Sequence, residues 1–313
     1  MIFGTPLTWF LAEILSVVLF VVCLIHASKQ KDAVLRILEL VAFLLYSGIF
    51  ENIGVYAKIY DYDLHRIMLV GKVPAGILLF EAVIFYVGLR LTEFLDIPNW
   101  GKPFVVGFLA SLQDMTMDPA AVFDLHSFNG VISGQWNWTP HYAGGFFNIP
   151  YFNFTGWMSM MVYYTAFILI GECLYKKNQQ PFVGYIYPFA AALLSVILMV
   201  SPLNQLVLFG APLVPLYTKN VELVLLVINF SIACLILLKC QKPTRAFNFW
   251  RDGIVIAIPF VLHLYDIMVA FALRIEVAYV PVVLVSAIHL LYLFHVIRPR
   301  QAAVPEKLFD CVI

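Results

Sequence analysis

Long apolar stretches recur from one end of the chain to the other, and they constrain the fold more than any other feature. Each is close to the roughly 20 residues that an α-helix needs to cross the hydrocarbon core of a bilayer. The runs are continuous, whereas the strands of a membrane barrel alternate apolar and polar residues. The sequence therefore predicts an all-α, polytopic integral membrane bundle of about nine helices, although the weaker boundaries also fit eight or ten. The predicted spans are about 8–27, 34–56, 73–92, 103–123, 153–175, 182–201, 220–239, 253–273 and 279–297.

Composition excludes a soluble fold and a nucleic-acid partner. Hydrophobic residues make up 62% of the 313 residues and charged residues 12%, against roughly 25% charged in an average soluble domain. Lys plus Arg equals Asp plus Glu at 19 each, so there is no basic excess to attract the phosphates of nucleic acid. We therefore expect lipid to surround most of the protein.

The basic residues divide unevenly between the two sets of loops that nine spans create. One set holds 14 of the 19 Lys and Arg residues and the other holds five, which are Lys58, Arg66, Lys72, Lys219 and Arg274. Loops rich in Lys and Arg remain in the cytoplasm. We therefore expect the N-terminus outside and the C-terminus in the cytoplasm.

No internal repeat or linker divides the chain, so residues 1–313 are predicted to form a single transmembrane domain with a short cytoplasmic tail at about 298–313. The Pro-rich segment 202–215 could re-enter the membrane. The longest connection, about 124–152, has no Lys or Arg and is dense in Gly, Asn and aromatic residues. A long loop of this kind is usually functional when it is ordered. We expect an ordered outer loop whose aromatic side chains lie at the level of the lipid headgroups.

Ionisable side chains within the spans show where chemistry could occur, because each costs roughly 2.5–3.5 kcal/mol at the centre of a membrane helix. Four lie near predicted span ends, where we expect them to reach water or pair with a neighbour: Glu13, Glu39, Glu172 and Glu222. The others are Glu51, Glu81, Asp114, Asp118, Asp266, His263 and His289.

The segment "SLQDMTMDPAAV" places two acids on one helix face, since Asp114 and Asp118 are four residues apart. Pro119 disfavours helical geometry at the residue before it, so we expect Asp118 at a helix end or kink. Two close carboxyl groups cannot both ionise cheaply in an apolar site, and the one that stays protonated can act as a general acid.

The predicted topology brings further polar groups to the same level of the membrane. The second span ends outside at Glu51, and the fourth span places Asp114 and Asp118 in its outer half. The fifth span starts outside with "NFTGW", which contains Asn153 and Trp157. We expect these side chains and the aromatic outer loop to converge on one pocket in the outer leaflet.

Motifs for several cofactor chemistries are absent. The seven histidines form no HxxxH or HxxHH cluster, and the sequence has no HExxH zinc motif, P-loop or GxGxxG turn. The spaced acids that remain suggest either proton-driven chemistry or the binding of Mg²⁺ and a diphosphate. The second is weakened, because Asp114 and Asp118 are the only close acidic pair within a span, whereas membrane prenyltransferases normally have two Asp-rich motifs.

Four segments together resemble a known family: "ENIGVY", "LQDMTMDPAAV", "GQWNWTPHYAGG" and "IPYFNFTGW". They are similar to the pattern of the membrane carotenoid biosynthesis proteins, which include the carotenoid and bisanhydrobacterioruberin hydratases. The resemblance covers about 50–160. Two segments depart from the family pattern. "HYAGGFFNIPYFNF" is longer than the corresponding segment of the family, and "YDYDLHRIMLVGKVP" carries more charge than the family pattern leads us to expect.

The resemblance implies that the protein adds water to a terminal double bond of a linear polyene or isoprenoid taken from the bilayer, without a cofactor. Asp118 or Asp114 would be the acid, and its partner or Glu51 would be the base that holds water. The side chains expected to bind the substrate are Trp136, Trp138, Tyr142, Asn153 and Trp157.

Two alternatives stay open at this point. A membrane terpenoid cyclase would begin with the same protonation, but a second alkene would capture the cation. A lipid or proton-coupled transporter would use Asp114, Asp118 and Asp266 as relay sites. His263 and Asp266, three residues apart on one face, are expected to form a buried hydrogen-bonded contact. The oligomeric state stays open.

Overall fold

A computed structural model describes residues 1–178, 180–210, 218–240 and 242–297. This part of the chain contains nine long helices, which coincide one by one with the nine predicted spans. They are α1 (Leu7–Ser28), α2 (Ala33–Tyr56), α3 (Ala75–Phe94), α4 (Lys102–Val122), α5 (Tyr151–Asn178), α6 (Pro181–Met199), α8 (Lys219–Lys239), α10 (Ile254–Ala272) and α11 (Glu276–Ile297). Within the described ranges, eight are long and apolar enough to cross a membrane, and the other is α4. The predicted all-α polytopic bundle is confirmed.

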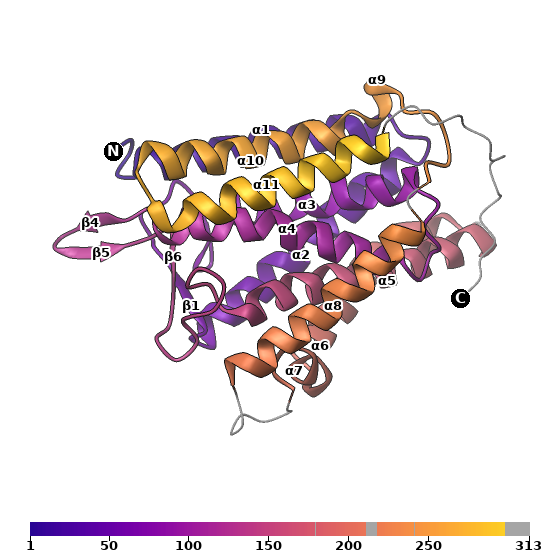
Figure 1. The fold of residues 1–313 in the computed structure, drawn as a ribbon. Helices are drawn as coiled ribbons and strands as arrows, with labels where there is room; N and C mark the ends of the chain where they lie inside the picture. Colours follow the sequence, from indigo (N-terminus) through magenta and orange to yellow (C-terminus); the bar gives the residue numbers. More distant parts are fainter. Residues whose placement is uncertain (179, 211–217, 241, 298–313) are drawn as a thin grey trace.

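Most of the long helices run along one common direction and define two ends of the molecule (Figure 1). The short strands and the N-terminus lie at one end, which we call the cavity end. The short helix α9 (Phe249–Asp252) lies at the other, which we call the arginine end because Arg36, Arg90 and Arg251 lie there. Within the segment 202–215, residues 202–209 form the short helix α7 (Pro202–Phe209). Residues 211–217 and the tail at 298–313 lie outside the described residues.

Helices α3 and α4 occupy the centre of the bundle. In α3, 94% of the membrane-spanning window is buried, compared with 28% in α8, and most of α4 is buried as well. Gly107 allows α4 to approach α5 closely, since a Cβ atom there would lie 2.8 Å from the carbonyl oxygen of Met158. The surrounding helices therefore shield α4 from lipid, which lets it carry acidic residues.

The helix α4 does not end at Asp118. It continues through Pro119 to Val122, so Asp118 lies inside the helix and one turn before its end. Pro119 has no N–H to donate to the carbonyl group one turn earlier, which is that of Met115. Helix α4 therefore loses only one internal hydrogen bond at Pro119 and still forms one more turn, so Asp118 is not its last residue. A kink at this point stays a prediction.

Short strands, which the sequence did not predict, organise the loops at the cavity end. Strand β1 (Tyr60–Tyr62) pairs antiparallel with β6 (Trp136–Trp138). The other two pairs are β2 (Leu69–Val70) with β3 (Val73–Pro74), and β4 (His126–Phe128) with β5 (Val131–Ser133). In the β1 and β6 pair, Tyr60 lies opposite Trp138 and Tyr62 opposite Trp136. Alternate residues of a strand share one face, so these four aromatic side chains lie on the same side.

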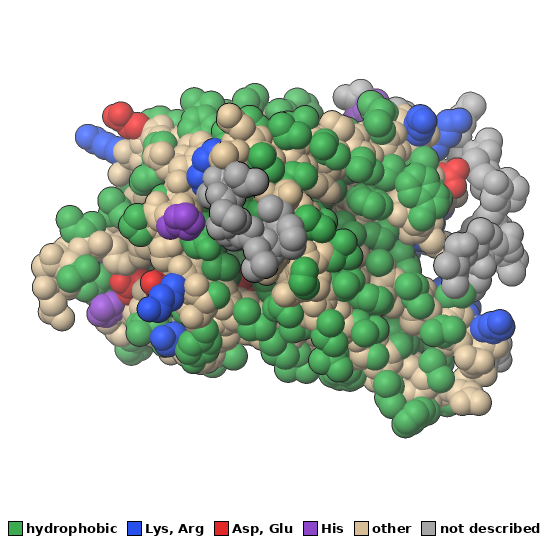
Figure 2. All heavy atoms as spheres, turned by 90° about the horizontal axis from the view of Figure 1, so that it is seen from below, with side chains coloured by type: hydrophobic (Ala, Val, Ile, Leu, Met, Phe, Trp, Pro, Cys, Tyr) green, Lys and Arg blue, Asp and Glu red, His purple; other side chains and the backbone are tan. Residues whose placement is uncertain are grey.

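The outside of the bundle is largely apolar. Figure 2 shows a broad hydrophobic surface, with the charged side chains gathered mainly toward its two ends. Leu193, Leu235 and Leu291 are among the apolar side chains that are more than half exposed along the long helices. Large exposed apolar surfaces of this kind face lipid in a membrane protein. The protein is an integral membrane protein.

Candidate active site

A cavity of about 270 Å³ opens into the bundle at the cavity end. Helices α2, α3, α4, α5, α6 and α7 and strands β1 and β6 contribute side chains to it. Seven of the eight predicted site residues line it: Glu51, Asp114, Asp118, Trp136, Trp138, Asn153 and Trp157. Tyr142 does not line it, and its ring lies 5.5 Å from that of Phe152, which does.

The amide group of Asn153 joins the two aspartates. Its Nδ2 atom donates hydrogen bonds to Oδ2 of Asp114 at 2.6 Å and to Oδ2 of Asp118 at 2.7 Å. Both aspartates are buried, and the indole of Trp136 also lies within hydrogen-bonding reach of Asp118. In the described part of the chain, neither aspartate forms an ion pair with a Lys or Arg side chain. Two carboxyl groups this close together, without a cation, are expected to share a proton.

Contacts at the start of α5 fix the position of Asn153. Helix α5 begins at Tyr151, and the backbone N–H of Phe152 donates to Oε2 of Glu222 on α8 at 3.1 Å. A carboxylate at this position satisfies an N–H group that the helix itself leaves unpaired. Ser111 on α4 donates to the carbonyl oxygen of Phe154 at 2.9 Å. These bonds hold the first turn of α5 against α4 and α8.

A second pair of carboxyl groups faces the same cavity. Glu51 on α2 and Glu81 on α3 lie within hydrogen-bonding reach of each other, and Ser47 donates to Glu81. Tyr60 and Tyr62 donate to Oε2 of Glu51 at 2.8 Å and 2.6 Å. Burial and then the charge of Glu51 raise the pKa of both tyrosines well above the usual value, so both remain hydrogen-bond donors.

Sequence analysis missed Glu81, Tyr60 and Tyr62 as residues of the site. Glu81 was recognised as an ionisable group within a span, and its position near the middle of that span was the available signal. The alternating "YDY" of residues 60–62 was the signal for a strand with two tyrosines on one face.

Aromatic side chains form much of the cavity wall. Trp138 packs at near right angles against Tyr60 and Phe152, with ring centroids 5.2 Å and 5.6 Å away. Its indole nitrogen is buried and has no hydrogen-bond partner among the described residues, as is also true of Oδ1 of Asp114. Both groups belong to side chains that line the cavity. The arrangement therefore combines proton donors, proton acceptors and aromatic ring faces.

Among the described residues, no group of three or more His, Cys, Asp or Glu side chains could hold a metal ion.

A polar cluster lies on another side of α4. Thr116 donates to Oδ2 of Asp266 at 2.8 Å and lies 3.1 Å from Nδ1 of His263. His263 in turn lies 3.0 Å from His289. The predicted contact between His263 and Asp266 is therefore formed through Thr116.

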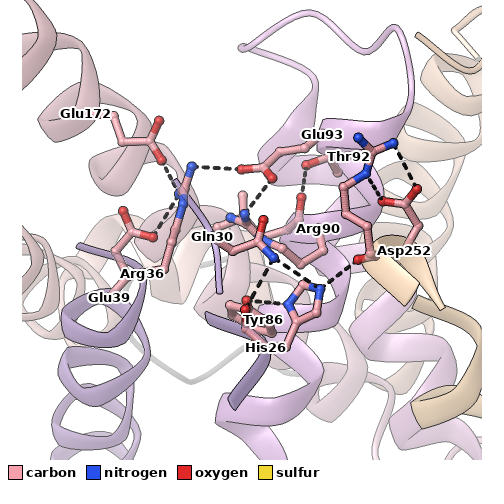
Figure 3. Close-up of polar contacts among 12 residues, drawn as sticks. His26, Gln30, Arg36, Glu39, Tyr86, Arg90, Thr92, Glu93, Glu172 and Asp252 are labelled. Atoms are coloured by element: carbon pink, nitrogen blue, oxygen red, sulfur yellow. Dashed lines mark hydrogen bonds and ion pairs between the residues drawn. The ribbon is translucent and has the colours of Figure 1, made fainter. Parts of the chain in front are cut away.

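Each of the four glutamates near the span ends lies close to a basic side chain, which is one of the two outcomes expected from the sequence. Arg36 lies 2.9 Å from Glu39 and 2.5 Å from Glu172, as Figure 3 shows. Lys219 lies 3.3 Å from Glu222, and Arg66 lies 3.9 Å from Glu13. We call the group of Arg36, Glu39, Arg90, Glu93 and Glu172 the arginine cluster.

The fold and the cavity define a polytopic membrane protein that brings buried carboxyl groups and aromatic rings together near one end of the bundle. The chain belongs to the carotenoid biosynthesis protein family, whose sequence model matches residues 12–215. That range includes every residue that lines the cavity. Comparisons with curated proteins and with solved structures give no match. The family resemblance inferred from the motifs is confirmed, and it assigns the protein a role in carotenoid biosynthesis.

Proposed function

We propose that the protein is a cofactor-independent hydratase that adds water to a terminal double bond of a linear carotenoid. The observation that carries this proposal is the pair of Asp114 and Asp118, joined by Asn153, which shares one cavity with Glu51. The family supplies the class of substrate, and the geometry supplies the proton donors and acceptors.

The first step is protonation of the alkene. The shared proton leaves the aspartate pair, and Asp118 is its donor. The π electrons of the double bond form a new C–H bond at the less substituted carbon, which leaves a tertiary carbocation at the other carbon. Positioned general acids of this kind contribute about 10²–10⁴-fold to a reaction rate.

Two features then stabilise the cation. The faces of Trp136, Trp138 and Trp157 offer negative potential, worth about 0.5–2 kcal/mol for each well-placed ring. The aspartate pair, which has just lost a proton, adds a negative charge nearby. Both act on the intermediate and not on the neutral polyene, as catalysis requires.

Capture by water completes the reaction. A water molecule that donates a hydrogen bond to Glu51 attacks the cation through its oxygen, and the released proton passes to the Glu51 carboxylate. Tyr60 and Tyr62 hold that carboxylate in place. Proton transfer from Glu51 back to the aspartates restores the site, so each cycle consumes one water molecule and no net proton.

Exposed apolar side chains at the edge of the cavity support entry of the substrate from lipid. Ile53 on α2 and Val200 at the end of α6 line the cavity and are 37% and 47% exposed. The volume of about 270 Å³ is at the lower limit of ligand pockets, which span roughly 300–1,000 Å³. We therefore propose that one end of the polyene occupies the cavity while the rest of the chain stays in the bilayer.

We propose that the cavity end lies on the outer face and the C-terminus in the cytoplasm, because the loops at the cavity end hold the smaller share of Lys and Arg. A C-terminal epitope tag is then protected in intact cells and accessible only after they are permeabilised.

Expression in a host that makes a linear carotenoid tests the proposed activity. The expected product is heavier than the substrate by one or two water molecules, and Asp118→Asn abolishes it. Asp61→Asn is the matched control, because Asp61 is exposed on β1 and does not line the cavity. A product with the mass of the substrate would show a cyclase instead. Unchanged pigments, together with proton-linked uptake into vesicles, would show a transporter.

A further inference from the structure

A second and smaller cavity lies beside the large one, among α1, α3, α4 and α10. Its volume is about 20 Å³, and one water molecule needs about 10–15 Å³ on this measure. Ile77, Met117 and Trp136 line both cavities. These shared side chains form a common wall between the small cavity and the site of the aspartate pair.

Glu13 carries an unsatisfied oxygen atom in this region. Its side chain lines the small cavity and is only 7% exposed. Its Oε2 atom accepts a hydrogen bond from the backbone N–H of Ile67 at 3.1 Å. Its Oε1 atom accepts none from any described residue and lies 3.9 Å from Nη1 of Arg66. That separation is too long for a hydrogen bond and suits a bridging water molecule.

Arg66 is fixed at this distance by its other contacts. Its guanidinium donates to Oε1 of Gln135 at 3.2 Å and to the carbonyl oxygen of Gln135 at 2.7 Å, and it packs over Trp9 at 4.4 Å. Burial lowers the pKa of Arg66 to about 10, which leaves it positively charged near neutral pH. Arg66 therefore offers a fixed cation beside the carboxylate of Glu13, with the small cavity next to both.

Asp266 provides a third polar group on the α10 side of the small cavity. Its Oδ2 atom accepts a hydrogen bond from Thr116 at 2.8 Å, which fixes the carboxyl group against α4. A water molecule usually needs two to four polar partners in a protein interior. Glu13, Arg66 and Asp266 meet that requirement.

We propose that the small cavity is a water-binding site formed by Glu13, Arg66 and Asp266, and that it supplies the water consumed in the large cavity. The supply role rests on the proposed hydratase function, whereas the binding site does not. A polyene that enters from lipid displaces water from the large cavity, so the reacting water needs a separate route. Met117 is an unbranched side chain in the common wall, and its rotation can open that route.

Radiolytic labelling tests the binding site without any activity measurement, because ionised bound water oxidises the side chains beside it. Phe80 is the reporter, since it is 4% exposed and lines only the small cavity of the two. Phe85, which is fully buried and lines neither, is the reference. Oxidation of Phe80 well above that of Phe85 supports the site, and equal oxidation overturns it.

Two matched substitutions on α10 test the supply role. Val269→Ile adds one methylene group to the small cavity. Val255→Ile adds the same group to a third cavity, also of about 20 Å³, between α3, α4, α10 and α11. We expect Val269→Ile to suppress labelling of Phe80 and to slow hydrate formation about tenfold at saturating carotenoid, while Val255→Ile changes neither.

The outcomes separate the two proposals. Equal rates for the two variants would overturn the supply role while leaving the hydratase function in place. If the wild-type protein forms no hydrate, the proposed function fails, and the labelling of Phe80 still decides the water site.

Discussion

Buried carboxyl groups gather at both ends of the bundle, but their partners differ. In the arginine cluster, Arg36 contacts Glu39, Glu93 and Glu172 at 2.5–3.0 Å, and Arg90 contacts Glu93 at 2.6 Å. Around the large cavity, the carboxyl groups accept hydrogen bonds from one amide and three hydroxyl groups. No ion pair joins a cavity carboxyl group to Lys or Arg within the described ranges.

The difference in partners suits the carboxyl groups of the arginine cluster to stabilising the fold and those around the cavity to transferring protons. A carboxylate paired with arginine is held in its charged form and cannot give up a proton. Carboxyl groups that face one another keep a proton available, and groups of this kind are typical of functional sites. We therefore expect substitutions in the arginine cluster to affect folding and substitutions around the cavity to affect turnover.

The largest expected effect is that of Asp118→Asn compared with Glu172→Gln. Asp118→Asn removes the acid and lowers the hydration rate about 10³-fold, within the range for general acids. It leaves the unfolding temperature unchanged or higher, because it removes repulsion between carboxyl groups. Glu172→Gln lowers the unfolding temperature and keeps the rate. Rates and thermal unfolding in detergent check both variants, and a reversed pattern would contradict the comparison.

The next largest effect is expected from replacing Arg36, the cation at the centre of the arginine cluster. Arg36→Met leaves Glu39, Glu93 and Glu172 without their shared partner, and breaking a buried ion pair costs about 3–5 kcal/mol. We expect a large fall in the free energy of unfolding. Protein that does fold should retain the wild-type rate for each folded molecule. Wild-type stability in this variant would show that the cluster does not hold the helices together.

Two tyrosine substitutions sharpen the comparison, because each removes one hydroxyl donor from a buried glutamate. Tyr62 donates to Glu51 beside the cavity, and Tyr187 donates to Glu39 in the arginine cluster. Tyr62→Phe should lower the rate about tenfold, since one hydrogen bond to a charged group contributes about 1.5–3 kcal/mol. Tyr187→Phe should lower stability by about 1.5 kcal/mol or more on the same basis and leave the rate unchanged. Equal rates for the two variants would argue against Glu51 as the base.

The smallest expected effect is on the pH dependence of stability, and it involves Asp252 at the arginine end. Burial raises the pKa of Asp252, but hydrogen bonds from Arg245, the backbone of Asn248 and Arg251 outweigh it and hold the pKa below its usual value. The resulting stability is present above the unfolded pKa of about 3.9 and is lost as the pH falls through the lower folded pKa. Asp252→Asn should therefore destabilise the protein near pH 6 by about 0.5–1 kcal/mol and flatten its acid dependence. The unfolding temperatures of the wild type and of Asp252→Asn, measured between about pH 6 and pH 3, test this expectation. Parallel pH profiles for the two proteins would contradict it.

Local patterns in the sequence predicted the helices and the aspartate pair. Apolar runs define the spans without reference to the rest of the fold, and four-residue spacing places Asp114 and Asp118 on one side of α4 whatever packs against it. Glu81 could not be assigned to the site, because its contact with Glu51 depends on how α2 and α3 pack. Tyr60 and Tyr62 escaped notice because β1 is three residues long and pairs with a strand far along the chain.

The pairing of β1 with β6 has a consequence for biosynthesis. The two strands belong to loops that emerge on the same side of the bundle, one before α3 and the other after α4. A nascent chain that has inserted only three helices has no aromatic wall for the site. The wall can close only after α4 has crossed and the second loop has followed the first. A shift of one residue in their pairing would turn two of the four aromatic side chains away from the other two. Assembly of this site is therefore completed outside the hydrocarbon core, after membrane insertion of the helices that carry its acids.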